Sequence, residues 1–146
     1  MVSDGLRDGA TAWSRTVTDA AGVRAARMQF ASYLRRRHLP EDLVQDCLLI
    51  FGELAGNAVV HAGGDVRIRV SVHKHQPVLC ITDRAGDAKV TIGHTEAAHE
   101  SGRGLRIVQR LSRGVWIERA AGMKSVCAAL PCREATASFH RNEISA

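Results

Sequence analysis

The chain has 146 residues, enough for one domain with its own hydrophobic core. Hydrophobic residues make up 45% of the chain and charged residues 24%, as is ordinary for a globular protein, and no internal repeat or low-complexity segment appears. The formal charge of +5 raises the question of nucleic-acid binding, but the basic residues are dispersed, and the densest cluster, at residues 35–38, is typical of a solvated helix end.

The N-terminal part of the chain predicts a leader, a strand and a helix. Residues 1–10 are polar and contain no signal-peptide core, so we expect a loose leader there. Residues 11–17 have β character around Trp13 and Val17 and are expected to add an edge strand. Asp19 can cap the helix that follows, whose apolar stripe runs to about Arg37.

The apolar stretch at residues 43–62 predicts the central helix. Pro40 and the two acids after it open a helix well, because acids favour the positive end of the helix dipole. The apolar positions recur at steps of three and four, the period of a helix buried along one face. Glu53 and Asn57 lie one turn apart on one flank. Buried together they indicate a polar ligand, whereas at a solvent edge they indicate only an amphipathic helix.

The second half of the chain is expected to supply most of a sheet. Residues 65–73 alternate between apolar and polar side chains, residues 78–82 form an apolar strand ending at Asp83, and residues 115–118 and 125–130 form a hairpin. The loop between Asp83 and Ser101 is long enough to be a lid. We therefore predict an α+β fold, a two-layer sandwich with a mostly antiparallel mixed sheet, helices on one face and a lid loop. The domain spans residues 11–131 and is followed by a polar tail at residues 132–146.

The four cysteines, Cys47, Cys80, Cys127 and Cys132, are widely spaced and form no CxxC motif. Their spacing indicates neither a zinc site nor a disulfide framework. Small buried thiols are the expected state, and a reducing cytoplasm is the expected location. No apolar run approaches the roughly 20 residues of a membrane span.

Three features together indicate a phosphate-containing ligand. The Gly102-Arg103-Gly104 turn is expected to open a short helix, and glycines at a helix start let backbone N–H groups approach an anion. The amide oxygen of Asn57 is a suitable ligand for Mg²⁺, which keeps several waters and bridges phosphate oxygens. The carboxylate of Asp83, at a strand end, can accept a hydrogen bond from an exocyclic amine such as that of adenine. Each of these signals is weak when it is taken alone.

Taken in order, these residues resemble the ATP-binding boxes of the GHKL (Bergerat) fold. The matching segments are E-L-x-x-N at Glu53 to Asn57, Asp83 with Gly86, and S-G-R-G-L at Ser101 to Leu105. The small size, the short lid and the G-x-K-S-V sequence at residues 122–126 look most like the anti-sigma-factor serine/threonine kinases and related bacterial regulators. The resemblance covers roughly Trp13 to Leu130.

The resemblance implies a role for each matching residue. Asn57 would coordinate the magnesium ion, Asp83 would bind the adenine amino group, and Ser125 would support adenine through water. The glycines Gly86, Gly102 and Gly104 and the amide of Leu105 would form the phosphate-binding part of the site. Glu53 matches the general base that takes the proton from a partner's serine. We add the hypothesis that Arg103 neutralises the terminal phosphate, the alternative being a surface arginine in a lid.

One segment departs from the family pattern. The first glycine box commonly reads D-x-G-x-G, whereas residues 83–87 keep a single displaced glycine, Gly86, and add Asp87. An unpaired anion at that place would oppose ATP. ATP binding and phosphate transfer are therefore separate expectations.

The resulting functional prediction is a cytoplasmic ATP-binding regulator of the anti-sigma type. It would bind Mg²⁺ and ATP, phosphorylate a serine on an antagonist protein and control the availability of a sigma factor. The resemblance also implies a homodimer, whereas membrane insertion and direct DNA binding are not expected. The alternative is a protein-interaction regulator of the same fold that is catalytically inactive, with or without bound nucleotide.

Overall fold

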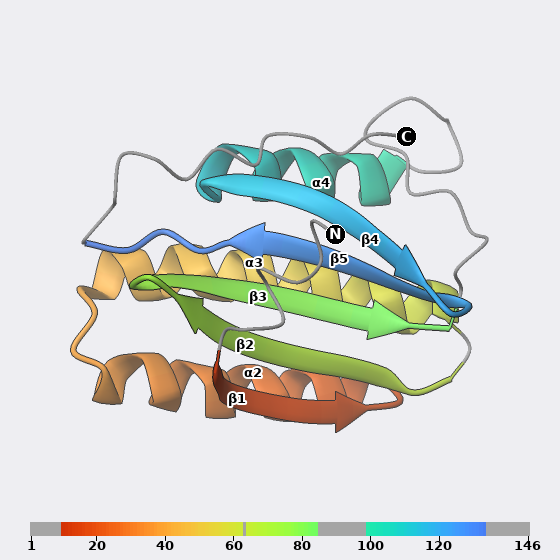
Figure 1. The fold of residues 1–146 in the computed structure, drawn as a ribbon, viewed down its shortest axis with the longest axis horizontal. Helices are drawn as coiled ribbons and strands as arrows, with labels where there is room; N and C mark the ends of the chain where they lie inside the picture. Colours follow the sequence, from red (N-terminus) through yellow and green to blue (C-terminus); the bar gives the residue numbers. More distant parts are fainter. Residues whose placement is uncertain (1–9, 63, 85–98, 134–146) are drawn as a thin grey trace.

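A computed structural model describes residues 10–62, 64–84 and 99–133, without the side chains of residues 99–103. In these residues a single sheet is covered on one face by helices (Figure 1). The elements in chain order are β1 (Ala10–Val17), α2 (Ala20–Arg36), α3 (Glu41–Ala62), β2 (Val66–His73), β3 (Gln76–Asp83), α4 (His99–Leu111), β4 (Gly114–Ala120) and β5 (Met123–Ala129).

The sheet has the strand order β1-β2-β3-β5-β4, and every pairing among the described strands is antiparallel. The expected edge strand is confirmed, because β1 pairs only with β2 among these strands. The predicted α+β sandwich with helices on one face is confirmed as well, although no parallel pairing appears in the described part. Of the expected lid between Asp83 and Ser101, residues 85–98 lie outside the described residues, and residues 99–101 belong to α4.

Two hairpin turns fix the register of the central strands. Lys74 and His75 have φ of 49° and 67°, and Ala121 and Gly122 have φ of 53° and 73°. Two consecutive left-handed residues match the twist of the flanking strands and define a two-residue hairpin. The strand expected to begin at residue 78 therefore begins earlier, because Gln76 and Pro77 already belong to β3.

The core lies between α3 and the sheet. Eight residues of α3 are buried, and Phe51 packs against Phe30 of α2 and Trp13 of β1, with ring centroids 5.0 and 6.0 Å away. Asp19 caps α2 as predicted, accepting a hydrogen bond of 2.7 Å from the backbone N–H of Gly22. The helix period of the sequence thus identified the buried face correctly.

The expectation about membrane spans needs a correction. By length and composition alone, α3 is apolar enough to cross a membrane, with a mean hydropathy of 1.5. The core helix of a folded domain passes the same test, and α3 buries its apolar residues against the sheet and the neighbouring helices. Its apolar character is thus explained by packing within the domain.

The expectation about cysteines is wrong for two of the four. Cys80 of β3 and Cys127 of β5 are directly opposite each other, with Cα atoms 4.2 Å apart, and form a disulfide. They are 47 residues apart in sequence, so no local spacing pattern marks them. Because disulfides are typical of oxidising compartments, the cysteines no longer support a reducing cytoplasm. Cys47 and Cys132 are free, as expected.

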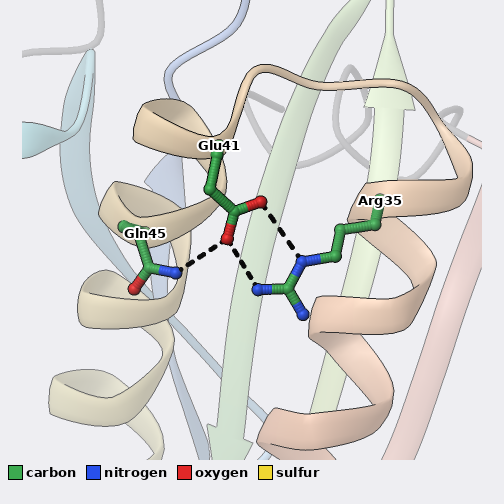
Figure 2. A network of polar contacts seen from close by, with 3 residues as sticks. All are labelled: Arg35, Glu41 and Gln45. Atoms are coloured by element: carbon green, nitrogen blue, oxygen red, sulfur yellow. Dashed lines mark hydrogen bonds and ion pairs between the residues drawn. The ribbon is translucent and has the colours of Figure 1, made fainter.

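A polar network joins the end of α2 to the start of α3 (Figure 2). The guanidinium of Arg35 donates to both carboxylate oxygens of Glu41, at 3.3 and 2.7 Å, and the side-chain amide of Gln45 donates to Glu41 at 3.0 Å. The hydrogen bond from Arg35, followed by that from Gln45, lowers the pKa of Glu41. Both residues of the ion pair are exposed, so solvent screens it.

A Glu41→Gln variant tests this network. A lowered pKa in the folded state means that the charged carboxylate stabilises the fold above its unfolded-state pKa, about 4.3 for glutamate. The wild type is expected to melt at a higher temperature than the variant at pH 7, and the gap is expected to close as the pH falls below about 4. Thermal unfolding across this pH range measures the gap. A gap that persists at low pH would contradict the ion-pair account.

Candidate functional site

The site begins with the polar flank of α3. Glu53 and Asn57 are both half-buried on this helix, one turn apart, while Leu54, Ala55 and Ala58 face the core. This arrangement follows from the helix period, since residues four apart share a flank. The structure therefore places the carboxylate and the amide at the margin of the core, accessible to a ligand and partly shielded from water.

The second helix of the site packs directly against Glu53. A Cβ atom built on Gly104 of α4 would collide with Oε2 of Glu53 and lie 3.0 Å from its Cδ atom. Only glycine leaves this space for the carboxylate, because any other residue would place a side chain there. The close approach brings together two of the motifs that the sequence analysis singled out, from helices far apart in the chain.

The start of α4 differs from the expected one. The helix begins at His99, so Gly102 and Gly104 lie inside it and do not form a turn before it. In an α-helix the amides of the first three helical residues lack a partner, and the fourth residue donates to the cap carbonyl, as Val23 does to Asp19 in α2 and Val44 to Pro40 in α3. The unpartnered amides of α4 are therefore those of residues 99–101, and the amides of Gly102, Gly104 and Leu105 lie beyond them. The side chain of Leu105 is buried in the core. The side chain of Arg103 and all of Gly86 lie outside the described residues.

The third part of the site is the end of β3, where Asp83 is 1% exposed. Its neighbour Ile81, two residues earlier, belongs to the core between sheet and helices, so Asp83 faces the helices too. In the register of β3 and β5 it stands opposite Lys124, whose Nζ atom lies 3.8 Å from Oδ2 of Asp83. Both side chains are buried, with exposures of 2% and 7%.

Ser125 is not where the sequence analysis expected it. Its hydroxyl shares a hydrogen bond of 2.7 Å with that of Thr82. Thr82 precedes Asp83 in the strand, so the two hydroxyls point to the sheet face opposite Asp83. The structure therefore does not bring Ser125 together with Asp83 on one face of the sheet.

The residue that shares the face of Asp83 is Lys124, to which the sequence analysis gave no role. Its position in the G-x-K-S-V sequence was visible, but only the strand register shows that it meets Asp83. A buried cation beside a buried carboxylate compensates part of the penalty for burying either charge. Lys124 is thus part of the environment of the proposed adenine-binding carboxylate.

The contact between Glu53 and Gly104 can be tested by substitution. Gly104→Ala in a Glu53→Ala background is expected to raise the unfolding free energy by roughly 0.5–1 kcal/mol, the usual gain from alanine inside a helix. In the wild-type background the new methyl group displaces the carboxylate, so the gain is expected to shrink or reverse. Urea unfolding of the wild type, the two single variants and the double variant measures the effect of Gly104→Ala in each background.

Gly56→Ala serves as the matched control. Gly56 lies in α3, and an added Cβ atom has no neighbour within 4 Å. The effect of Gly56→Ala on the unfolding free energy is expected to be the same with glutamate and with alanine at position 53. An equal effect of Gly104→Ala in both backgrounds would contradict the described contact.

Comparison with known proteins agrees with this geometry. The model of the histidine kinase-like ATPase domain matches residues 16–130. The fold is similar to a chain in the crystal structure of the SiaB–SiaC complex from Pseudomonas aeruginosa, with a TM-score of 0.59 and 14% identity, over 88% of this chain and 95% of that chain. A comparison with curated protein sequences finds no match. Because the family model covers most of the chain and the fold agrees, the chain belongs to the histidine kinase-like ATPase domain family.

Proposed function

We propose that the chain is a regulator that binds Mg²⁺ and ATP and phosphorylates a serine on an antagonist protein, thereby controlling a sigma factor. The packing of Glu53 against Gly104 carries the proposal, because it joins a half-buried carboxylate to the helix that bears the glycine motif. Membership of the ATPase family supports nucleotide binding. The availability of ATP is the ground on which the proposal locates the chain in the cytoplasm, whereas the Cys80–Cys127 disulfide does not support that compartment.

The described residues fit a nucleotide in two respects. Asp83 offers a buried carboxylate at a strand end, and a carboxylate can accept hydrogen bonds from several donors at once. Asn57 offers a half-buried amide oxygen, a suitable ligand for a magnesium ion between phosphates. We assign adenine recognition to Asp83 and magnesium coordination to Asn57.

Phosphate binding is assigned to the first turn of α4. The amides of residues 99–101 lie at the positive end of the helix, where they suit an anion. For Gly102, Gly104 and Leu105 to contribute their amides, as the family resemblance implies, this turn has to open when the nucleotide binds. We assign Gly86, which lies outside the described residues, and Arg103, whose side chain does, to the lid side of the same site.

Glu53 is proposed as the general base of phosphate transfer. The serine oxygen of the partner forms a bond to the terminal phosphorus of ATP while the bond from that phosphorus to the bridging oxygen of ADP breaks. The serine proton passes to Glu53, and the products are phosphoserine and ADP. Half-burial suits this role, because the carboxylate has to be ionised and still within reach of a partner's hydroxyl.

The proposed partners are proteins. The structure of similar fold is a complex of two proteins, SiaB and SiaC, which supports a regulator that acts on a partner. We propose an antagonist protein that carries the target serine, together with a sigma factor that the chain holds. Formation of a homodimer stays a prediction from the family resemblance.

Nucleotide binding is tested by calorimetric titration with ATP, with and without magnesium. Asp83→Asn removes the charge of a hydrogen-bond acceptor and is expected to weaken binding roughly 10- to 100-fold, the effect of losing one charge-assisted hydrogen bond. Asn57→Ala is expected to remove the magnesium dependence. Asp42→Asn, at an exposed position in the first turn of α3, is the matched control. It is expected to leave the ATP affinity and its magnesium dependence unchanged.

Phosphate transfer is tested separately with Glu53→Gln. This variant keeps the size of the side chain and is expected to bind ATP within about twofold of the wild type. Its rate of serine phosphorylation is expected to fall at least about 100-fold, as for loss of a general base. The measurement is phosphoserine detection by mass spectrometry on proteins retained by the immobilised wild-type chain. An unchanged rate in the variant would contradict the role of Glu53.

The alternative is a regulator of the same fold that does not transfer phosphate. One observation favours its nucleotide-independent form: Lys124 pairs with Asp83 and would compete with the adenine amino group for that carboxylate. In this case the wild-type chain forms no phosphoserine on any retained partner, and Lys124→Met is expected to bind ATP more tightly than the wild type. The kinase proposal predicts instead that the wild-type chain forms phosphoserine on a retained partner.

A further inference from the structure

A second cavity lies at the end of the molecule away from Asp83. Its volume is about 400 Å³, which is within the usual range of small-molecule sites. The turn between α2 and α3, the β2–β3 turn and the segment after β5 enclose it. Pro77, in the lining, and Asp83 are at opposite ends of β3, roughly 20 Å apart at about 3.3 Å per residue.

The lining combines an apolar interior with basic residues. Most of the side chains are aliphatic, aromatic or proline, and the others are the thiols of Cys47 and Cys132 and the basic group Arg37, His38, His75 and Arg133. Among the described residues that line it, none is acidic. Burial raises the pKa of the Cys47 thiol to about 12, so this thiol is uncharged at neutral pH.

Local structure places Arg37 and two histidines at the cavity. The guanidinium of Arg37 lies over the ring of Tyr33, 5.6 Å from its centroid, and both residues belong to the lining. His38 and His75 have φ of 60° and 67°. Glycine or asparagine adopts this left-handed backbone more readily, yet two separate turns place a histidine there, facing the same cavity.

We propose that this cavity binds a small organic anion with an apolar body and one carboxylate. The apolar interior accepts the chain or ring, and Arg37 and Arg133 neutralise the carboxylate. A metal ion does not fit, because the described residues contain no group of His, Cys, Asp or Glu suited to hold one. The site is independent of the proposed nucleotide site.

Octanoate is the probe, and octanamide is its neutral control of the same length. The full chain is titrated with each by calorimetry, and two-dimensional amide NMR locates the response. Octanoate is expected to bind in the submillimolar range and to shift the amides of the turns around the cavity, and octanamide is expected to bind at least tenfold more weakly. Equal affinity for the two, or no octanoate binding at 10 mM, would overturn the proposal.

Substitutions test which residues contact the ligand. Arg37→Gln and Arg133→Gln are each expected to weaken octanoate binding at least fivefold. Arg36→Gln is the matched control, because Arg36 is an exposed neighbour of Arg37 and does not belong to the lining. Equal weakening by Arg36→Gln would show a general charge effect and would overturn the proposed site.

His75→Gly separates ligand binding from folding. Glycine suits the left-handed position better, so the melting temperature is expected to stay the same or rise. Octanoate affinity is expected to fall at least threefold, because the imidazole is lost from the cavity. An unchanged affinity in this variant would remove His75 from the proposed site. In that case the assignment of the histidine turns to ligand binding would be wrong.

Discussion

The two-sided character of α3 is the constraint on which the rest of the structure depends. One face has to be buried against the sheet and the neighbouring helices, and its eight buried residues satisfy that need. The remaining flank carries Glu53 and Asn57 at the edge of the core. The core therefore fixes the rotation of the helix and with it the direction in which the polar pair points. A polar pair on a helix held in this way is positioned by packing before any ligand arrives.

Helix α4 completes the arrangement because a glycine allows it to come close. Gly104 lets the backbone of α4 approach the carboxylate of Glu53, while Leu105 and Val108 on the same helix enter the core. The same contact ties the conformation of α4 to the proposed base, so a change in the first turn of α4 also moves the surroundings of Glu53. Asp83 and Lys124 form the third part of the site on the strands beneath.

The local elements could be predicted from the sequence because their signals are local. The apolar period, Pro40 and the cap at Asp19 are sufficient to place α2 and α3, and alternation is sufficient to place β2. The disulfide, the partner of Asp83 and the position of Ser125 depend on how β3 and β5 align, and a shift of one residue exchanges the two sheet faces. Such alignment is set by the whole sheet and by its tight turns. The sequence motifs therefore identified the family, but only the strand register shows that Lys124, and not Ser125, shares the sheet face of Asp83.

The central claim is that the flank of α3, the end of β3 and helix α4 form one nucleotide site. Amide NMR of the labelled chain during titration with Mg²⁺ and a non-hydrolysable ATP analogue tests it most directly. The account predicts magnesium-dependent shifts at Glu53, Asn57, Asp83, Gly104 and Lys124, with the cavity at the other end of β3 unaffected. Shifts confined to one of the three elements, or none at millimolar analogue, would contradict it.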